Sequence, residues 1–321
     1  MKNAKNKTVL GLMILAAIVS GCTGGGGTEE DEGSSSVTVD EFSAFPNPVP
    51  AEQNVQFRLT LVNDGGRDAT NVYAKLFNPP FGSGGQAFST SSGGDPSSSD
   101  RTLEYEELQI GTDQTPAVPQ TDQADFQSPS LSPNREIGYS FKSYIAFNYS
   151  TVGTAEVEIM GEDKYRDEGS PQTSAGLENS RAPVQMEIRT PTPIPIYDDS
   201  GGEVTKQLCV IVRNQGSGVP FKPSAVPTGT SDSEFNLTDI QGAENSVNIT
   251  LNDIGDVEFN STDGGGNTRS IEIHDGKGVG CYNMNIDTST GTLQRTLPVR
   301  VDANYGYRKI STANVRVEGR R

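Results

Sequence analysis

Two segments of the chain alternate between apolar and polar side chains, and they resemble each other. In residues 54–63 the side chains of Phe57, Leu59 and Leu61 face one way, and the polar residues between them face the other. Strict alternation over this length predicts a half-buried β-strand, and the Asn-Asp-Gly sequence at its end predicts a turn. Residues 207–216 repeat this arrangement 151 positions later.

The match between these two segments extends to individual positions. A cluster of three prolines precedes each copy, and each copy ends in an Asn-x-Gly sequence. The matched pairs are Gln56 with Gln207, Leu59 with Val210, Asn63 with Asn214 and Gly65 with Gly216, and the proline clusters are Pro46, Pro48, Pro50 and Pro191, Pro193, Pro195.

A second pair of matching segments lies near the end of each half. Residues 147–161 match residues 305–319 at an offset of 158, and both contain an aromatic-x-aromatic step followed by an alternating run. This pattern predicts a strand, a short turn and another strand, so that each half closes with a hairpin. Two matches in the same order, at similar offsets, indicate a tandem duplication.

The strand that ends in Asn63-Asp-Gly65, and the strand predicted next at residues 69–77, resemble the small immunoglobulin-like sandwiches of cell surfaces. The nearest comparison is with the cell-adhesion-related domains of archaeal and bacterial envelope proteins. The resemblance implies an all-β fold with two tandem immunoglobulin-like β-sandwiches, at residues 37–161 and 184–321, joined by a linker at residues 162–183. The chain lacks Trp, so it departs from the antibody-type pattern with its buried Trp, and the strand order stays open.

Two long segments between the predicted strands have low sequence complexity. Residues 78–100 are rich in Gly and Ser, and residues 112–133 are rich in Gln, Pro, Thr and Ser. Neither segment buries enough apolar surface to offset the entropy of ordering, so we expect disorder there. The alternative is that these loops bind a partner, as loops of sandwiches often do. We predict no amphipathic helix beyond Cys22.

The N-terminus has the features of an export signal. Lys2, Lys5 and Lys7 precede a mostly apolar run at residues 8–19, which is too short to span a membrane. The sequence Val-Ser-Gly-Cys that ends at Cys22 resembles the lipobox of secreted lipoproteins. That resemblance implies cleavage of residues 1–21 and a lipid on the Cys22 thiol. The alternatives are an ordinary signal peptide with an incidental Cys, or an uncleaved anchor.

Charge places further limits on function. Loss of residues 1–21, with their three lysines, changes the formal charge from −17 to −20. So acidic a chain argues against electrostatic capture of nucleic acid. Residues 22–36 combine a Gly run with four acidic residues, which predicts a flexible tether reaching at most roughly 50 Å. This composition resembles archaeal surface lipoproteins, particularly halophilic ones, although acidic groups also simply keep a protein hydrated.

The two cysteines that remain after Cys22 are candidates for a disulfide. Cys209 and Cys281 both point away from the apolar faces of their predicted strands, so a bridge between them would join outer faces. An exported protein enters an oxidising compartment, which favours the bridge. The alternative is two unrelated reduced thiols.

Four sequences have the Asn-x-Ser/Thr pattern of N-glycosylation acceptors, a pattern that is also common by chance in such a chain. They begin at Asn148, Asn236, Asn248 and Asn260. Asn148 lies inside a predicted strand and is therefore the least suitable of the four.

Evidence for a metal or catalytic site is weak. Asp263, Asn267 and Asp275 lie in a Gly-rich region that could offer oxygen ligands to Ca²⁺, but their spacing does not match an EF-hand loop. The single histidine, His274, excludes a zinc site with several His ligands and is the only residue that could serve a Ser–His–Asp triad. No nucleophile motif accompanies it, so we interpret it as a surface residue and expect no cofactor.

The sequence therefore predicts a non-catalytic, lipid-anchored protein on the extracellular face of the cell membrane, serving as an envelope structural or adhesion module. Its expected partners are the membrane, through the lipid on Cys22, and other envelope proteins or glycans, but not nucleic acid. The alternative is an extracellular lipoprotein that binds a carbohydrate or Ca²⁺.

Overall fold

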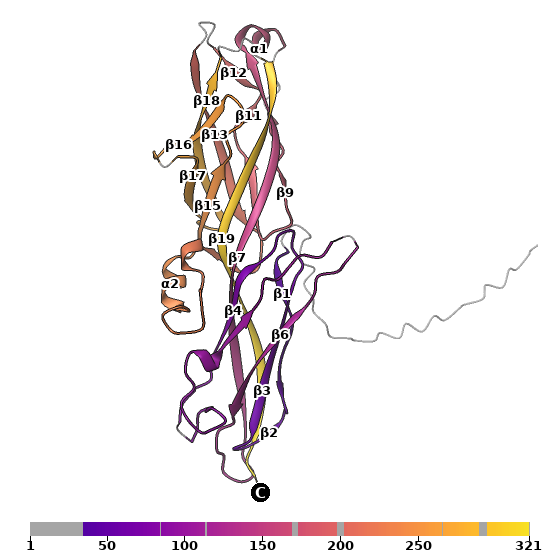
Figure 1. Cartoon of the computed structure of the whole chain (residues 1–321), viewed down its shortest axis with the longest axis vertical. Helices are drawn as coiled ribbons and strands as arrows, with labels where there is room; N and C mark the ends of the chain where they lie inside the picture. Colours follow the sequence, from indigo (N-terminus) through magenta and orange to yellow (C-terminus); the bar gives the residue numbers. More distant parts are fainter. Residues whose placement is uncertain are drawn as a thin grey trace, which may run out of the picture.

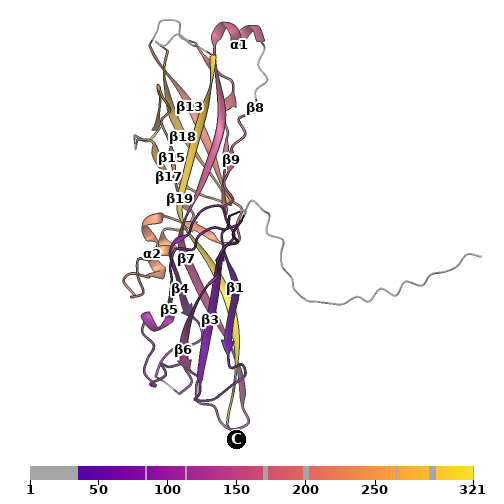
Figure 2. The same ribbon diagram turned by 45° about the vertical axis from the view of Figure 1, so that its right-hand side comes forward.

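The protein is an elongated all-β rod whose strands run along its long axis (Figures 1 and 2). The predicted all-β fold is therefore confirmed. The computed structural model describes residues 35–320 apart from residues 84, 113, 169–172, 198–201, 265 and 289–293.

Two very long strands run through the whole rod. β7 (Glu136–Gly161) has 26 residues and β19 (Gln294–Glu318) has 25, whereas an average strand has about five or six. They pair antiparallel in one continuous register, from Gln294 opposite Met160 to Glu318 opposite Glu136. At about 3.3 Å per residue this ladder spans roughly 80 Å.

One half of this ladder belongs to the part of the rod that we call the lower sandwich. Residues 136–148 of β7 and 306–318 of β19 form one sheet with β2, β4 and β5, in the order β2-β19-β7-β4-β5, and a sheet β1-β3-β6 packs against it. The strands that belong to this sandwich alone are β1 (Val37–Phe45), β2 (Val49–Pro50), β3 (Asn54–Asn63), β4 (Thr70–Phe77), β5 (Thr102–Tyr105) and β6 (Gln120–Gln127).

The other half of the ladder belongs to the upper sandwich. Here residues 149–161 of β7 and 294–305 of β19 form the order β12-β7-β19-β15-β17, and a sheet β10-β13-β18-β16 packs against it. The strands of this sandwich are β10 (Val184–Ile188), β12 (Ile194–Ile196), β13 (Glu203–Asn214), β15 (Ser246–Leu251), β16 (Val257–Ser261), β17 (Thr268–Glu272) and β18 (Lys277–Asp287).

The remaining elements are short. A two-stranded pair and one further strand lie beside the upper half of β7, and a short strand pairs with β19 near the middle of the rod. They are β8 (Thr173–Ser174), β9 (Glu178–Asn179), β11 (Pro191–Thr192), β14 (Val219–Phe221), the helices α1 (Glu162–Glu168) and α2 (Leu237–Gly242), and the 3₁₀ turns η2 (Ser99–Arg101) and η3 (Pro223–Ala225).

The predicted closing hairpins are wrong. Where the sequence predicts turns, near residues 150–153 and 308–311, both strands continue without interruption. Consequently β7 leaves the lower sandwich and completes the upper one, while β19 leaves the upper sandwich and completes the lower one. Each sandwich receives one strand from the other half of the sequence.

This exchange follows the internal repeat. Asn148 lies opposite Gly306, and these two positions are related by the repeat offset of 158, so the ladder has an approximate two-fold axis at this pair. We call the region around it the waist. The short strands β2 and β12 obey the same symmetry, since each lies at the end of a proline cluster and pairs in parallel with a long strand at Val317 or Ile159.

The strand pairing does not coincide with the predicted division into residues 37–161 and 184–321. Residues 306–318 pair with the first half, residues 149–161 pair with the second, and the predicted linker contains α1, β8 and β9. The chain enters the rod at the waist, because Val37 at the start of β1 lies opposite Asn63, whose side chain contacts Tyr149.

The two low-complexity segments are more ordered than their composition predicts. Residues 120–127 form β6, which pairs with β3. From the Gly/Ser-rich segment, Phe88 is fully buried, and its ring lies 4.7 Å from that of Phe141, while the ring of Phe81 lies 5.1 Å from that of Phe126. Single aromatic residues thus fix loops whose average composition is polar.

We predict that Gly306→Ala destabilises the protein by about 1–3 kcal/mol, the usual cost of overpacking. A Cβ at Gly306 would clash with the ring of Phe221 and would lie 2.7 Å from Val226. Gly138→Ala is the matched control on the same ladder, because a Cβ at Gly138 meets no atom within 4 Å. Urea unfolding of both variants measures the difference; equal stabilities would show that the waist is not tightly packed.

Candidate functional site

Cys22 and most of the predicted tether, together with the whole predicted signal segment, lie outside the described residues. Lipidation at Cys22 therefore stays a prediction. Within the part of the chain that the structure describes, no helix is long and apolar enough to cross a membrane.

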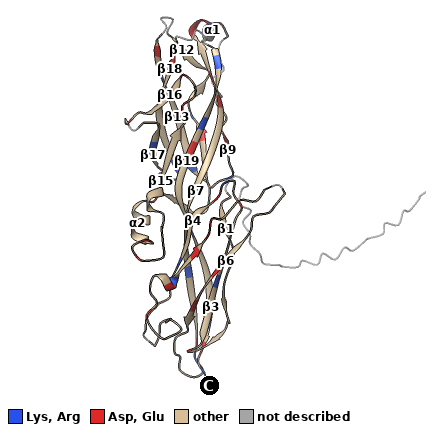
Figure 3. Cartoon of the chain, in the orientation of Figure 1, with Lys and Arg blue, Asp and Glu red and all other residues tan. Residues whose placement is uncertain are grey.

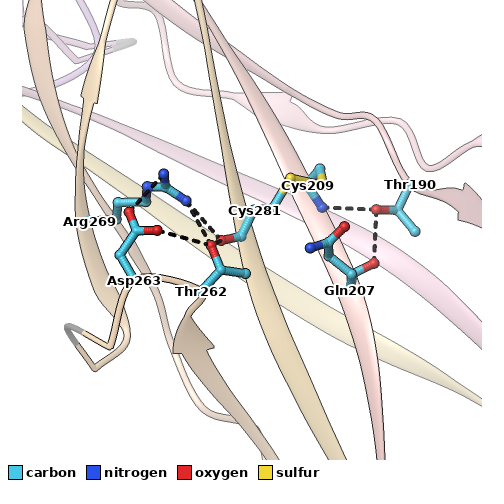
Figure 4. Close-up of a disulfide and its surroundings, with 7 residues drawn as sticks. All are labelled: Thr190, Gln207, Cys209, Thr262, Asp263, Arg269 and Cys281. Atoms are coloured by element: carbon cyan, nitrogen blue, oxygen red, sulfur yellow. Dashed lines mark hydrogen bonds and ion pairs between the residues drawn. A yellow bond between two sulfur atoms is a disulfide. The ribbon is translucent and has the colours of Figure 1, made fainter.

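The predicted disulfide is confirmed. Cys209 on β13 and Cys281 on β18 are register partners with Cα atoms 4.0 Å apart, and their sulfur atoms are bonded. Both side chains are half-buried on the outer face of the sheet, as the alternation predicted. Figure 4 shows the bridge between two sets of hydrogen bonds: Cys209 N–H donates to Thr190 (2.8 Å), and the Cys281 carbonyl accepts from Thr262 (3.2 Å).

The candidate calcium ligands are not assembled into a site. Asp263 forms an ion pair with Arg269 at 2.8 Å, and Asp275 occupies a tight turn with Gly276, where both residues have positive φ. Among the described residues there is no group of three His, Cys, Asp or Glu side chains that could hold a metal. Asn267 lies in the turn before β17, so turn chemistry accounts for these residues.

The single histidine lies on the surface. His274 is 81% exposed, and its Nε2 is 3.4 Å from a carboxylate oxygen of Glu272. Acidic and basic residues are spread along both sandwiches rather than gathered on one element (Figure 3). Neither observation identifies a reaction centre.

The four glycosylation candidates occupy different settings. Asn148 lies at the waist within β7, Asn236 caps the N-terminus of α2, Asn248 lies within β15, and Asn260 is the exposed penultimate residue of β16.

The most distinctive constellation is the waist itself. Four rings, those of Phe147, Tyr149, Tyr305 and Tyr307, surround the two-fold axis with neighbouring centroids 5.9–6.2 Å apart. Edge-to-face and tilted pairs at this spacing add to the stabilisation that burial provides. The aromatic-x-aromatic steps noticed in the sequence therefore meet in space.

Two of these tyrosines bind the repeated Asn-x-Gly turns. The Tyr149 hydroxyl donates to Asn63 Oδ1 (3.3 Å), and the Tyr307 hydroxyl donates to Asn214 Oδ1 (3.1 Å). Burial raises the pKa of Tyr149 to about 12, so this hydroxyl keeps its proton at neutral pH. A side chain at Gly65 or Gly216 would clash with the respective hydroxyl, which explains why the glycine recurs.

A second contact joins the two halves of the sequence. Residues 219–245, which we call the clamp, extend from the second half onto the outer sheet face of the lower sandwich, beside β4 and β7 (Figures 1 and 2). Its buried apolar side chains pack on three residues of that face. The clamp contributes Phe221, Val226, Phe235 and Ile240, and the lower sandwich contributes Tyr73, Tyr144 and Ala146.

Polar contacts fix the position of the clamp. Lys75, whose side chain is only 8% exposed, donates to Asp232 (2.9 Å) and to the Phe235 carbonyl (3.1 Å). Arg308 pairs with Glu244 at 2.7 Å. The hydrogen bond from Lys75 is the main cause that lowers the pKa of Asp232. Sequence reasoning missed the clamp, although a lysine on the otherwise apolar strand at residues 72–77 was a signal that a partner covers it.

The fold and these contacts define an elongated all-β protein in which two sandwiches share their central strands. No family model and no curated protein sequence matches the chain. Among solved structures it is similar to collagen adhesin from S. aureus, with 9% identity, coverage of 89% of this chain and 94% of that chain, and a TM-score of 0.11. It is also similar to a triple jelly-roll protein of an archaeal virus, with 8% identity, coverage of 89% and 92%, and a TM-score of 0.09. Both are rich in β-structure, and scores this low carry no argument about function.

We predict that replacing both Cys209 and Cys281 with Ala lowers the free energy of unfolding. The chain-entropy treatment gives about 4 kcal/mol for the 72-residue separation of the two cysteines. Urea unfolding measures the loss, and the wild-type protein in reductant should match the double variant. Free thiols at both positions in unreduced protein would contradict the prediction.

We predict that the apolar part of the clamp outweighs its ion pair. Phe235→Ala removes a fully buried ring and should cost about 3 kcal/mol. Asp232→Asn should cost less than about 1 kcal/mol, because the Asp232 side chain is 77% exposed and solvent screens the pair. Hydrogen exchange across residues 219–245 distinguishes detachment of the clamp from global unfolding. Faster exchange of the clamp in Asp232→Asn than in Phe235→Ala would contradict the prediction.

The effect of Asp232→Asn should also depend on pH. Because the pKa of Asp232 is lowered in the folded protein, its contribution is present above the ordinary value of 3.8 and is lost as the pH falls through the folded value. The stability difference between wild type and Asp232→Asn should therefore be constant well above 3.8 and shrink as the pH is lowered through 3.8 and below. A difference that stays constant as the pH falls below 3.8 would mean that Asp232 does not act through its charge.

Proposed function

We propose that this chain is a non-catalytic, lipid-anchored protein of the extracellular face of the membrane, where it serves as a rigid spacer or adhesion module. The lipobox-like sequence at Cys22 supports the anchor. The bridge between Cys209 and Cys281 supports an oxidising compartment, since such bonds are rare in the cytosol. On this proposal the acyl chain on Cys22 supplies attachment, and the rod supplies reach.

The observation that carries the proposal is the continuous ladder of β7 and β19. Two sandwiches joined by a single linker would bend at it, because such interfaces normally allow relative motion. Here a sharp bend at the waist would distort the continuous ladder of the two long strands and disturb the packing of the four aromatic rings. A rod of this kind holds its two tips at a fixed separation, as a spacer requires.

The strand order supports an immunoglobulin-like interpretation of each sandwich. In the lower sandwich the first strand pairs in one sheet as β1 and then, at the end of the proline cluster, pairs in the other sheet as β2. The upper sandwich repeats this switch with β10 and β12. Contacts with other envelope proteins or glycans would be made by loops or sheet edges, which are the surfaces that such a sandwich exposes.

The alternative, a lipoprotein that binds a carbohydrate or Ca²⁺, has less support. The strand aromatics Phe57, Phe147, Tyr149, Tyr305 and Tyr307 are all buried in the core, so they offer no exposed platform for a sugar. Glycan arrays with and without Ca²⁺ separate the two functions, and specific calcium-dependent binding would favour the alternative.

We predict that wild-type protein extracted from membranes begins at Cys22 and carries added lipid mass. Cys22→Ser should move the protein out of the membrane fraction, because the acyl chains supply the anchoring energy. Intact-mass analysis and fractionation measure both effects. The control is the double variant with Ala at Cys209 and Cys281, since it also removes cysteines, leaves the lipobox intact and leaves no unpaired partner of the disulfide.

A wild-type protein that is unlipidated, or a Cys22→Ser variant that stays in the membrane fraction, would overturn the anchoring proposal.

A further inference from the structure

The four Asn-x-Ser/Thr sequences are equivalent by pattern, but the structure separates them. An N-linked glycan is bulky and hydrated, so its acceptor side chain must lie at the surface with room around it. The setting of each asparagine therefore decides which of them can carry one.

Asn148 and Asn248 lie in the interior of paired strands. Asn148 has Thr70 on one side and Gly306 on the other. Asn248 lies between Ser270 and Asn304 on neighbouring strands. Both side chains are half-buried among the side chains of adjacent strands, which leaves little room for a glycan.

The side chain of Asn236 caps a helix. Its Oδ1 accepts the N–H of Thr238 (3.0 Å) and so caps α2, and it directly follows Phe235, the buried anchor of the clamp. The cap fixes the orientation of a half-buried side chain. A glycan here would have to be accommodated against the clamp and the lower sandwich.

Asn260 meets the requirement best. It lies on β16, the edge strand of its sheet, where burial alternates strictly and the Asn260 side chain is on the exposed face. Thr262, the third residue of the sequon, is also exposed and lies in the turn that follows the strand. Acceptor sequences are expected in surface loops, and this one lies where a strand enters a loop.

We infer that Asn260 is the N-glycosylation site of this protein, an inference that rests on the proposed export of the chain. The donor is an oligosaccharide linked through phosphate to a lipid. Asn260 Nδ2 forms a bond to C1 of the first sugar, the bond from C1 to the phosphate oxygen breaks, and the phosphate leaves with the electron pair. The amide proton passes to a base of the transferase.

A glycan at this position has a physical consequence. An edge strand exposes unpaired backbone groups that can pair with another copy, and hydrated bulk beside the edge obstructs that approach. β16 is short and lies at the open end of the order β10-β13-β18-β16, so a glycan on Asn260 would protect the edge.

The test uses the full chain in an exporting host that glycosylates a control protein carrying the same Asn-x-Thr motif. Intact mass and peptide mapping should show added sugar mass on the peptide containing Asn260. Asn260→Gln should abolish this mass, while the matched control Asn248→Gln should retain it. Thr262→Ser preserves the acceptor pattern and should keep the glycan, whereas Thr262→Ala should lose it.

The same spectra distinguish failure of this inference from failure of the proposed function. Protein that is cleaved and lipidated at Cys22 but carries no sugar on Asn260 overturns the inference and leaves the anchor intact. Sugar mass that survives in Asn260→Gln and disappears in Asn236→Gln, Asn148→Gln or Asn248→Gln also overturns it. Protein with sugar on Asn260 but no lipid supports the inference and contradicts the anchor.

Discussion

The hydrogen-bonded ladder between β7 and β19 is the constraint on which the rest of the structure depends. Because each long strand completes the sheet of the other half, neither sandwich has a full set of strands from its own part of the sequence. Folding of one half therefore requires the distant strand of the other, and the contacts involved are non-local ones that form slowly. The same arrangement makes the two halves one cooperative unit. Tyr149 and Tyr307 reinforce it, since each binds the Asn-x-Gly turn of one sandwich from a strand segment that already belongs to the other.

Local sequence patterns predicted the features that depend on adjacent residues, such as strand positions and side-chain directions. They missed the features that depend on how the strands are connected. Alternation correctly predicted the strand at residues 54–63 and the outward direction of Cys209 and Cys281, because period two follows directly from strand geometry. It could not distinguish a hairpin at residues 150–153 from a continuing strand, since each residue has the same kind of neighbours in both cases. The burial of Phe88 was missed because the prediction for its segment rested on average composition, which is polar. The helix α2 has only six residues, too few for a helical period to be visible, so it could not be predicted. Lys75 indicated that its strand is covered, but no local pattern indicated which segment covers it.

Comparison of the two sandwiches shows that the polarity of side chains on an outer sheet face depends on whether another segment covers that face. The repeat offset of 158 relates Tyr144 and Ala146 on the lower sheet to Asp302 and Asn304 on the upper one. The first two are buried beneath the clamp. The second two lie on a face that no equivalent segment covers among the described residues, and Asp302 bonds to Asn252 and Arg300 there. Of these two related faces, one is thus an internal surface and the other has the polar character that contact with water requires.

The place where the chain enters the rod has a mechanical consequence. β1 begins at the waist, so under the proposed anchoring through Cys22 the rod would be attached near its midpoint rather than at a tip. Each arm is about 13 residues of ladder, roughly 40 Å, and the 14 residues after Cys22 reach at most roughly 50 Å. The two arms of the rod would then rotate together about this central point of attachment. A load at one tip produces a torque that turns the rod, and the opposite tip moves in the other direction. Such an attachment lets the protein tilt to meet a surface while its own strands stay unstrained.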